Sequence, residues 1–267
     1  MLNEDGYSVK GCSIIYHPKG QAGEYAKLAC NPFRGCGHGC VYCYVPNVIQ
    51  MARRDFDAGA KVRDDFLARL SSDARKYRDH GISDQVMLSF TTDPYNPDDA
   101  TNGFTRQVLH VLQSHGLGVC TLTKGGARAL RDLDLFRCER DAFATTLTTL
   151  NDVQSREWEP NAALPGDRIE TLRRFHNRGI FTWVSLEPVY DTEQTIKIIR
   201  ECADVVDLFK VGRINHHRVT RQIDWSAFTA RVLDALAETR SRHYIKKDLQ
   251  PFLPEGYANQ LYVSQFN

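Results

Sequence analysis

The segment Asn-Pro-Phe-Arg-Gly-Cys-Gly-His-Gly-Cys-Val-Tyr-Cys-Tyr, residues 31–44, holds three of the eight cysteines of this chain. Cys36, Cys40 and Cys43 are spaced so that three thiolates can surround one compact metal centre, and the glycines beside them let the backbone turn tightly. Iron–sulfur clusters normally take four cysteine ligands, so three neighbouring cysteines predict one iron that is open to an exogenous molecule. An open coordination position is typical of a catalytic metal centre.

Two alternatives would remove that open position. His38 could complete a Cys3His zinc site, although one residue on either side separates it from a cysteine, which is cramped for tetrahedral zinc. Cys12 or Cys30 could supply a fourth cluster ligand, but Cys30 ends a predicted strand, where packing is the more natural role.

Length and composition indicate a globular protein. The 267 residues suit one large α/β domain or two small ones, and a composition that is 42% hydrophobic and 25% charged is ordinary. No apolar run approaches the roughly 20 residues that cross a bilayer, and the N-terminus does not resemble a secretory signal. We therefore expect a cytoplasmic protein, without membrane association and monomeric. A net charge of +1 neither requires nor excludes a polyanionic partner.

Strand-like and helix-like segments alternate through most of the chain. The expected strands are Tyr25–Cys30, Gln85–Phe90, Gly118–Thr123, Ala142–Leu147, Phe181–Leu186 and Leu208–Gly212. The expected helices are Asp64–Arg78, Thr105–His115, Ala127–Phe136, Pro165–Arg178, Thr192–Ala203 and Trp225–Arg240. Six such units predict an α/β fold with parallel strands, a partial (β/α)6 TIM-type barrel. We assign residues 25–242 to the barrel, 1–24 to an N-terminal extension and 243–267 to a C-terminal appendage packed on the barrel.

In such folds the chemistry lies at the carboxyl ends of the strands. The cysteine segment follows the first predicted strand, and the later strands end in other reactive residues. These are Thr92 and Asp93, Lys124, Glu187 and Asn215.

The C-x3-C-x2-C spacing, with the aromatic Tyr42 before the last cysteine and a strand before the loop, resembles the radical S-adenosylmethionine (SAM) superfamily. The resemblance implies a [4Fe–4S] cluster on Cys36, Cys40 and Cys43, whose open iron chelates the amino and carboxylate groups of SAM. One-electron reduction, by an external donor of the flavodoxin or ferredoxin type, would cleave SAM to methionine and a 5′-deoxyadenosyl radical that abstracts hydrogen from a substrate. Tyr42 would then lie near the adenine of SAM.

A larger part of the chain, about residues 25–215, is similar to the spore photoproduct lyase-like branch of that superfamily. The similar segments are Asn31–Cys36, Thr92–Pro97, Leu147–Asn151 and Glu159-Pro160. Many members of this branch have no assigned substrate, so the branch does not by itself imply photoproduct repair.

The resemblance also implies roles for the strand-end residues. Thr92 and Asp93 stand where superfamily members usually place a Gly-Gly-Glu type motif for the SAM ammonium, although Asp-Pro also favours a simple turn. Lys124 could meet an anion, and Glu187 could contact the SAM ribose or the substrate. We assign Asn215 to the same cofactor site.

A radical reaction on a lesion or polypeptide needs a hydrogen donor to quench the product radical, and photoproduct lyases use a cysteine thiol. No motif aligns with that donor here. Cys120 on the third strand is the best-placed thiol, and Tyr95 and Tyr190 are the phenolic alternatives. Buried packing competes with this role for Cys120.

The sequence therefore leaves three hypotheses for the function. A stretch without acidic residues could bind nucleic-acid phosphates, for DNA lesion repair or base modification, if it shares the barrel mouth with Arg34, Arg53 and Arg54. The alternatives are radical SAM modification of a peptide or small metabolite and a non-enzymatic zinc or Fe–S binding module. The basic stretch consists of Lys210, Arg213, Asn215, His216, His217, Arg218 and Arg221.

Overall fold

The computed structural model describes residues 1–2, 6–215 and 217–257, so His216 and the last ten residues of the predicted appendage lie outside the described residues. Its main element is a seven-stranded sheet in which every neighbouring pair is parallel and the strands follow one another in sequence order. These strands are β1 (Leu28–Cys30), β4 (Gln85–Leu88), β5 (Gly118–Thr123), β6 (Ala142–Thr146), β7 (Phe181–Val189), β8 (Leu208–Arg213) and β9 (His243–Ile245).

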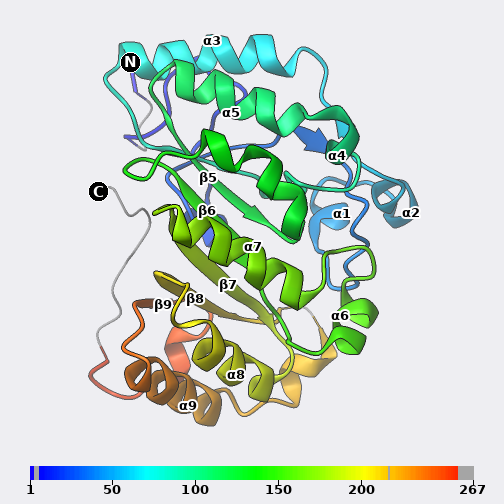
Figure 1. The fold of residues 1–267 in the computed structure, drawn as a ribbon, viewed down its shortest axis with the longest axis vertical. Helices are drawn as coiled ribbons and strands as arrows, with labels where there is room; N and C mark the ends of the chain where they lie inside the picture. Colours follow the sequence, from blue (N-terminus) through cyan, green and yellow to red (C-terminus); the bar gives the residue numbers. More distant parts are fainter. Residues whose placement is uncertain (3–5, 216, 258–267) are drawn as a thin grey trace.

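The longer helices follow the strands and lie along the outside of the sheet, from α3 and α5 at one end of the molecule to α8 and α9 at the other (Figure 1). They are α3 (Phe66–Asp79), α5 (Phe104–Ser114), α7 (Pro165–Asn177), α8 (Thr192–Cys202) and α9 (Trp225–Glu238). The shorter elements are β2 (Phe33–Arg34), β3 (Lys61–Val62), α1 (Val45–Val48), α2 (Arg53–Asp57), α4 (Asp99–Asn102), α6 (Asp152–Trp158) and the 3-10 turns η1 (Gly20–Glu24), η2 (Gly126–Leu135), η3 (Arg218–Arg221) and η4 (Gln250–Phe252).

Both faces of the sheet are buried, which explains why its strands are continuously apolar. Side chains alternate along each strand, so Val86 and Leu88 pack under the helices while Met87 faces the interior of the barrel. The interior face carries small residues such as Ala29 and Ala144, which fit the narrow concave side of a curved sheet.

The prediction of an α/β partial barrel of parallel strands is confirmed, and the sheet has one strand more than the six that we expected. The additional strand β9 lies in the segment assigned to the appendage, where Phe209 and Val211 of β8 pair with His243 and Ile245. The expected helix Ala127–Phe136 is the 3-10 helix η2.

Glu24 joins the first and last strands across the open side of the barrel. Its buried carboxylate oxygen Oε1 accepts hydrogen bonds from the Tyr244 hydroxyl and the Lys247 backbone N–H, both at 2.7 Å. The buried Lys210 ammonium donates to the backbone oxygens of Glu24 (3.0 Å) and Tyr25 (3.2 Å). In the described part of the chain, β1 and β9 are the edge strands of the sheet and do not pair with each other, so these polar side chains connect the two edges of the barrel.

Within the described residues, no helix is both long enough and apolar enough to cross a bilayer.

Replacing Glu24 by alanine should destabilise the barrel, because two buried donors lose their acceptor. We expect the free energy of unfolding to fall by about 2–4 kcal/mol, measured by urea denaturation. E24Q keeps one acceptor and should lose less, and alanine at the exposed Glu157 should change stability by less than about 0.5 kcal/mol. An E24A protein as stable as the wild type would show that Glu24 does not close the barrel.

Candidate functional site

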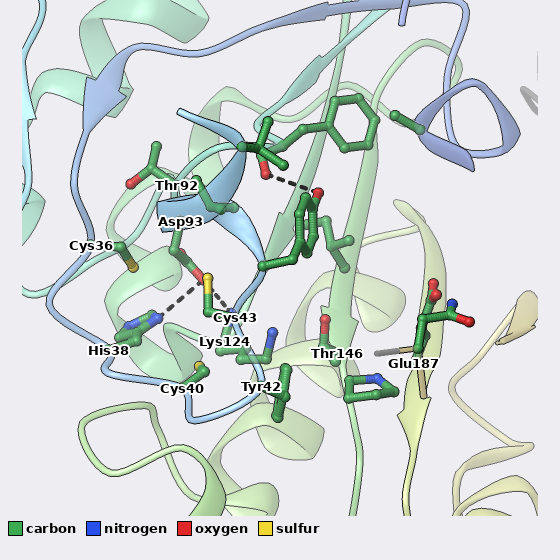
Figure 2. A pocket seen from close by; sticks show the side chains of 18 of the residues that line it. Cys36, His38, Cys40, Tyr42, Cys43, Thr92, Asp93, Lys124, Thr146 and Glu187 are labelled. Atoms are coloured by element: carbon green, nitrogen blue, oxygen red, sulfur yellow. Dashed lines mark hydrogen bonds and ion pairs between the residues drawn. The ribbon is translucent and has the colours of Figure 1, made fainter. Parts of the chain in front are cut away.

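The three predicted cluster ligands lie on one loop between β2 and α1, and the sulfur atoms of Cys36, Cys40 and Cys43 surround a common space (Figure 2). In the described residues, no three His, Cys, Asp or Glu side chains converge on a point that would suit a single metal ion. A [4Fe–4S] cluster binds each thiolate at a different iron, so three thiolates around a common space suit such a cluster.

Gly35 fixes the start of this loop. Its φ of +88° is a conformation that side chains rarely adopt, and an added Cβ would lie 2.3 Å from the backbone oxygen of Gly59. The next residue, Cys36, donates its backbone N–H to Phe56 at 2.9 Å. Position 35 therefore requires glycine for the loop to pack against the segment after α2.

A second segment, residues 158–161 at the end of α6 and directly after it, contacts the cysteine loop from the other side. The backbone N–H of Val41 donates to the Trp158 oxygen at 2.9 Å, and the N–H of Asn161 donates to the His38 oxygen at 3.1 Å. The amide side chain of Asn161 also donates to the Gly37 oxygen at 3.0 Å. These bonds satisfy loop backbone groups that would otherwise lack partners.

His38 is buried and uses both ring nitrogens within the protein. Arg128 Nη2 lies 2.7 Å from Nε2 of His38, and Nδ1 lies 3.4 Å from Asp93 Oδ2. A guanidinium can only donate, so Nε2 accepts from Arg128 and the proton on Nδ1 faces Asp93. Neither nitrogen then has a free lone pair for a metal, which argues against the Cys3His zinc site.

Asp93 connects this histidine to the ends of two strands. One carboxylate oxygen accepts from the Tyr95 backbone N–H (2.8 Å) and the Thr123 hydroxyl (2.5 Å), and the other accepts from the Lys124 backbone N–H (2.7 Å). Burial alone would raise the pKa of Asp93, but His38 and these donors hold it well below its usual range. Both oxygens are committed within the protein, so the geometry gives Asp93 a part in positioning the loop and no free oxygen for the SAM ammonium.

Thr92 also supports the loop. Its hydroxyl donates to the backbone oxygen of Gly35 at 2.7 Å, and its own backbone oxygen accepts from the Ser89 hydroxyl at 2.8 Å. Thr92 lines the cavity, but its hydroxyl proton is already used.

Tyr42 and Lys124 lie on the cavity wall beside Cys40. The Tyr42 hydroxyl donates to Glu159, whose other oxygen lies 2.5 Å from Arg168 Nη2, and both members of this ion pair are buried. The Lys124 ammonium lies 5.6 Å from the centre of the Tyr42 ring. Burial would lower the pKa of Lys124, but Cys40 and Glu159 raise it overall, so the ammonium stays charged and can meet an anionic group.

Glu187 and Asn215 lie on the wall across from the cysteine loop (Figure 2 shows Glu187). Glu187 accepts from Tyr25 at 2.5 Å and pairs with Lys246. The Asn215 side chain donates to Asp248 at 2.8 Å.

The two walls enclose one cavity of about 740 Å³, within the range of small-molecule sites. The cavity is lined by all of the predicted cluster-ligand and cofactor-site residues, which are Cys36, Cys40, Tyr42, Cys43, Thr92, Asp93, Lys124, Glu187 and Asn215.

The three predicted hydrogen donors are not among the residues that line this cavity. Tyr95 is fully buried in the core under the helices, and Tyr190 stacks on Trp158 with ring centres 4.1 Å apart while its hydroxyl donates to Thr148 at 3.2 Å. Cys120 faces the barrel interior among packed apolar side chains. Their role as hydrogen donors stays a prediction, and none of the three side chains reaches the cavity surface.

Several cavity residues were missed in the sequence. Tyr25, Tyr44 and Lys246 all line it. The stretch His243–Ile245 before Lys246 is only three residues long, too short to be recognised as a strand, so the sequence offered no signal for β9 or Lys246.

Substituting Gly35 by alanine should prevent cluster assembly, because the added methyl group collides with the Gly59 backbone. After anaerobic reconstitution, bound iron should fall from about four per chain in the wild type towards zero. Gly81 is the matched control, since its φ is +71° and an added Cβ there meets nothing within 4 Å. G81A should load normally at a stability cost of about 1 kcal/mol. Full iron and sulfide content in G35A would contradict the proposed loop geometry.

Comparison with known proteins gives related structures and sequences. A spore photoproduct lyase mutant with bound AdoMet and dinucleoside spore photoproduct is 14% identical, with a TM-score of 0.66 over 89% of this chain and 80% of that chain. SuiB from Streptococcus suis, bound to S-adenosylmethionine, is 13% identical, with a TM-score of 0.59 over 81% of this chain and 46% of that one. At these identities the likeness concerns the fold.

Relatives by sequence include uncharacterized proteins from Mycobacterium tuberculosis, 25% identical over 60% of this chain, and from Acidianus two-tailed virus, 26% identical over 79% of this chain and 75% of the viral protein. The chain matches about half (48%) of the length of the mycobacterial relative. The radical SAM superfamily matches residues 30–206, which include the cysteine loop and most of the sheet. With a [4Fe–4S] cluster and SAM as its cofactors, the chain belongs to the radical SAM superfamily.

Proposed function

We propose that this radical SAM enzyme acts on a nucleobase of a nucleic acid, by lyase-type repair of a lesion or by base modification. When bound, the cluster and SAM supply one-electron chemistry that ends in hydrogen abstraction from the substrate. The residues of the chain hold these groups and present the substrate. The observation that carries the proposal is a basic rim without carboxylate partners, formed by Arg213 on the cavity wall and the exposed Arg218 and Arg221 that follow it, beside a cavity that has an exposed aromatic side chain.

The cysteine loop and the loop after β8 border the same cavity, but Arg34, Arg53 and Arg54 do not line it, and Arg53 and Arg54 pair with Asp57 and Asp55. The cavity is lined by the cysteine loop and by Arg213, Asn215 and His217. The Arg213 guanidinium lies over the rings of Trp225 (5.8 Å) and Phe252 (5.9 Å), which hold it in place. Fixed arginines suit phosphate, because two N–H groups can bind two oxygens at once.

Arg218 and Arg221 follow in η3 and are exposed, outside the set of residues that line the cavity. Across residues 1–2, 6–215 and 217–257, the structure shows no ion pair between a carboxylate and Arg213, Arg218 or Arg221. Their positive charge is therefore available to an external anion.

The acidic residues near the cavity are already engaged. Asp98 accepts a backbone N–H from Ala60 at 2.7 Å, Asp99 lies 2.8 Å from Arg131, and Glu187 pairs with a lysine. These contacts reduce the repulsion that the same residues would otherwise exert on phosphates.

Apolar and aromatic side chains at the mouth could receive a base. Tyr44 is 56% exposed and Val48 is 65% exposed, and both line the cavity together with Phe90. A base stacked on an aromatic ring gains about 1–3 kcal/mol, which helps to offset the few kcal/mol needed to unstack it.

The structural neighbours point to two substrate classes. Spore photoproduct lyase has been captured with a dinucleoside photoproduct, whereas SuiB has been captured with the precursor peptide SuiA. The SuiB likeness supports peptide modification as the second candidate, and the unpaired rim arginines favour nucleic acid. Either reaction needs a one-electron reductant, for which a flavodoxin or ferredoxin is our proposal.

Binding of labelled single-stranded DNA should depend strongly on salt if the rim binds phosphates. The triple variant R213A/R218A/R221A should bind more weakly, and the slope of log affinity against log salt should shrink by about one for each phosphate that the variant no longer neutralises. The control R78A/R174A/R200A removes three arginines that are 51%, 62% and 53% exposed on other faces and should bind like the wild type. Tight binding that salt does not change would contradict phosphate recognition by the rim.

The chemistry is tested by anaerobic reconstitution with iron and sulfide, followed by dithionite and SAM. We expect 5′-deoxyadenosine, with formation enhanced by irradiated DNA or by RNA in a panel that also contains peptides. C40A should yield none, because the cluster loses a ligand. Enhancement by peptides alone would replace the nucleic-acid proposal with the second candidate.

A further inference from the structure

Tyr25, Glu187 and Lys246 form a buried polar cluster on the cavity wall that faces the cysteine loop (Figure 2 shows Glu187). The Tyr25 hydroxyl donates to Glu187 Oε2 at 2.5 Å, and the Lys246 ammonium pairs with the same oxygen. Lys246 also lies 4.5 Å from the centre of the Tyr25 ring. The side chain of Lys246 is only 2% exposed, so the ammonium is fixed in position.

Gly212 makes room for this cluster. A Cβ at this position would lie 2.8 Å from Cδ of Lys246 and 2.9 Å from Cδ of Glu187. Four separate parts of the chain thus meet at one carboxylate: the segment before β1, the end of β7, β8 and the residue after β9.

The other carboxylate oxygen, Oε1 of Glu187, has no hydrogen-bond partner among the described residues, and the side chain is 18% exposed on the cavity wall. Because Oε2 is held by two donors, Oε1 points in a fixed direction. Burial and the neighbouring Glu187 carboxylate raise the pKa of Tyr25 well above its usual value, so its hydroxyl remains a donor. Oε1 therefore remains an acceptor that faces the cavity.

The charge of Lys246 selects the kind of group that this acceptor would bind. The lysine neutralises the carboxylate, so a neutral N–H is favoured over a cation. Phe90 lies edge-on to Tyr25, with ring centres 6.0 Å apart at 64°, and lines the same cavity with Leu122. A flat, largely apolar ring that carries an N–H matches these surroundings.

We propose that Glu187 Oε1 accepts a hydrogen bond from an N–H of the substrate nucleobase, with Tyr25 and Lys246 as its positioning residues. This inference rests on the proposed function and adds the group that recognises the base. Glu187 has two competing roles, which are contact with a SAM ribose hydroxyl and a purely structural ion pair.

The test measures equilibrium binding of the cluster-loaded enzyme, with SAM present, to a short oligothymidylate and to the same oligonucleotide made with N3-methylthymine. Thymine is suitable because methylation removes its one base N–H. The wild type should prefer the unmethylated probe by roughly tenfold or more, the value of a hydrogen bond to a charged group. E187Q should lose the preference, because Tyr25 and Lys246 attract the amide oxygen and leave the NH2 group facing the cavity.

Y25F should lose part of the preference, because Oε2 keeps one donor, and this variant supplies a second measurement if E187Q folds poorly. E193Q is the matched control and should keep the preference, because Glu193 is an exposed carboxylate on α8 that pairs with Arg231 of α9. Equal discrimination by E187Q and the wild type would overturn the inference, as would a parallel loss of SAM affinity in E187Q, which would assign Glu187 to the cofactor. Failure of the wild type to bind either probe would overturn the proposed substrate class and this inference with it.

Discussion

Three thiolates have to be held in different directions on a short loop while one iron of the cluster stays open, and this constraint organises the structure around the site. Asp93 is central to meeting it, because its carboxylate joins the end of β5 to His38 between the cysteines. A buried charge is costly unless several donors surround it, and Asp93 receives four. His38 Nε2 in turn accepts a hydrogen bond from Arg128, so the loop is connected to η2 as well.

The site also depends on the curvature of the sheet. The cysteine loop follows the first strand, whereas Glu187, Arg213 and Lys246 come from the last three strands. They face one another because the open barrel is closed by Glu24 and Lys210, which link the segment before β1 to β8 and β9. The contacts that close the barrel therefore also bring the two walls of the cavity together.

Much of this arrangement could be predicted from local sequence. The cysteine spacing predicted the cluster ligands, and the strand ends predicted Lys124 and Glu187, which do line the cavity because parallel strands end at one edge. The seventh strand was missed because three residues carry too little periodicity to be recognised.

The contacts that define the site could not be predicted from the sequence because they join residues that are far apart along the chain. Tyr244 and Glu24 are 220 residues apart, and Lys246 and Tyr25 are 221 apart, so their meeting depends on the curvature of the whole sheet. Asp93 illustrates the same limit at short range. A carboxylate at a strand end can bind a ligand or the surrounding backbone, and only the folded geometry shows that its oxygens are occupied.

The central claim is that Cys36, Cys40 and Cys43 hold a [4Fe–4S] cluster with one iron free to bind SAM. The most direct measurement is electron paramagnetic resonance of the reduced, reconstituted protein, with and without SAM labelled with ¹⁷O in its carboxylate. We expect a cluster signal that shifts when SAM is added and shows hyperfine coupling to the label. A cluster signal that SAM leaves unchanged, or a protein that binds zinc in place of iron, would contradict it.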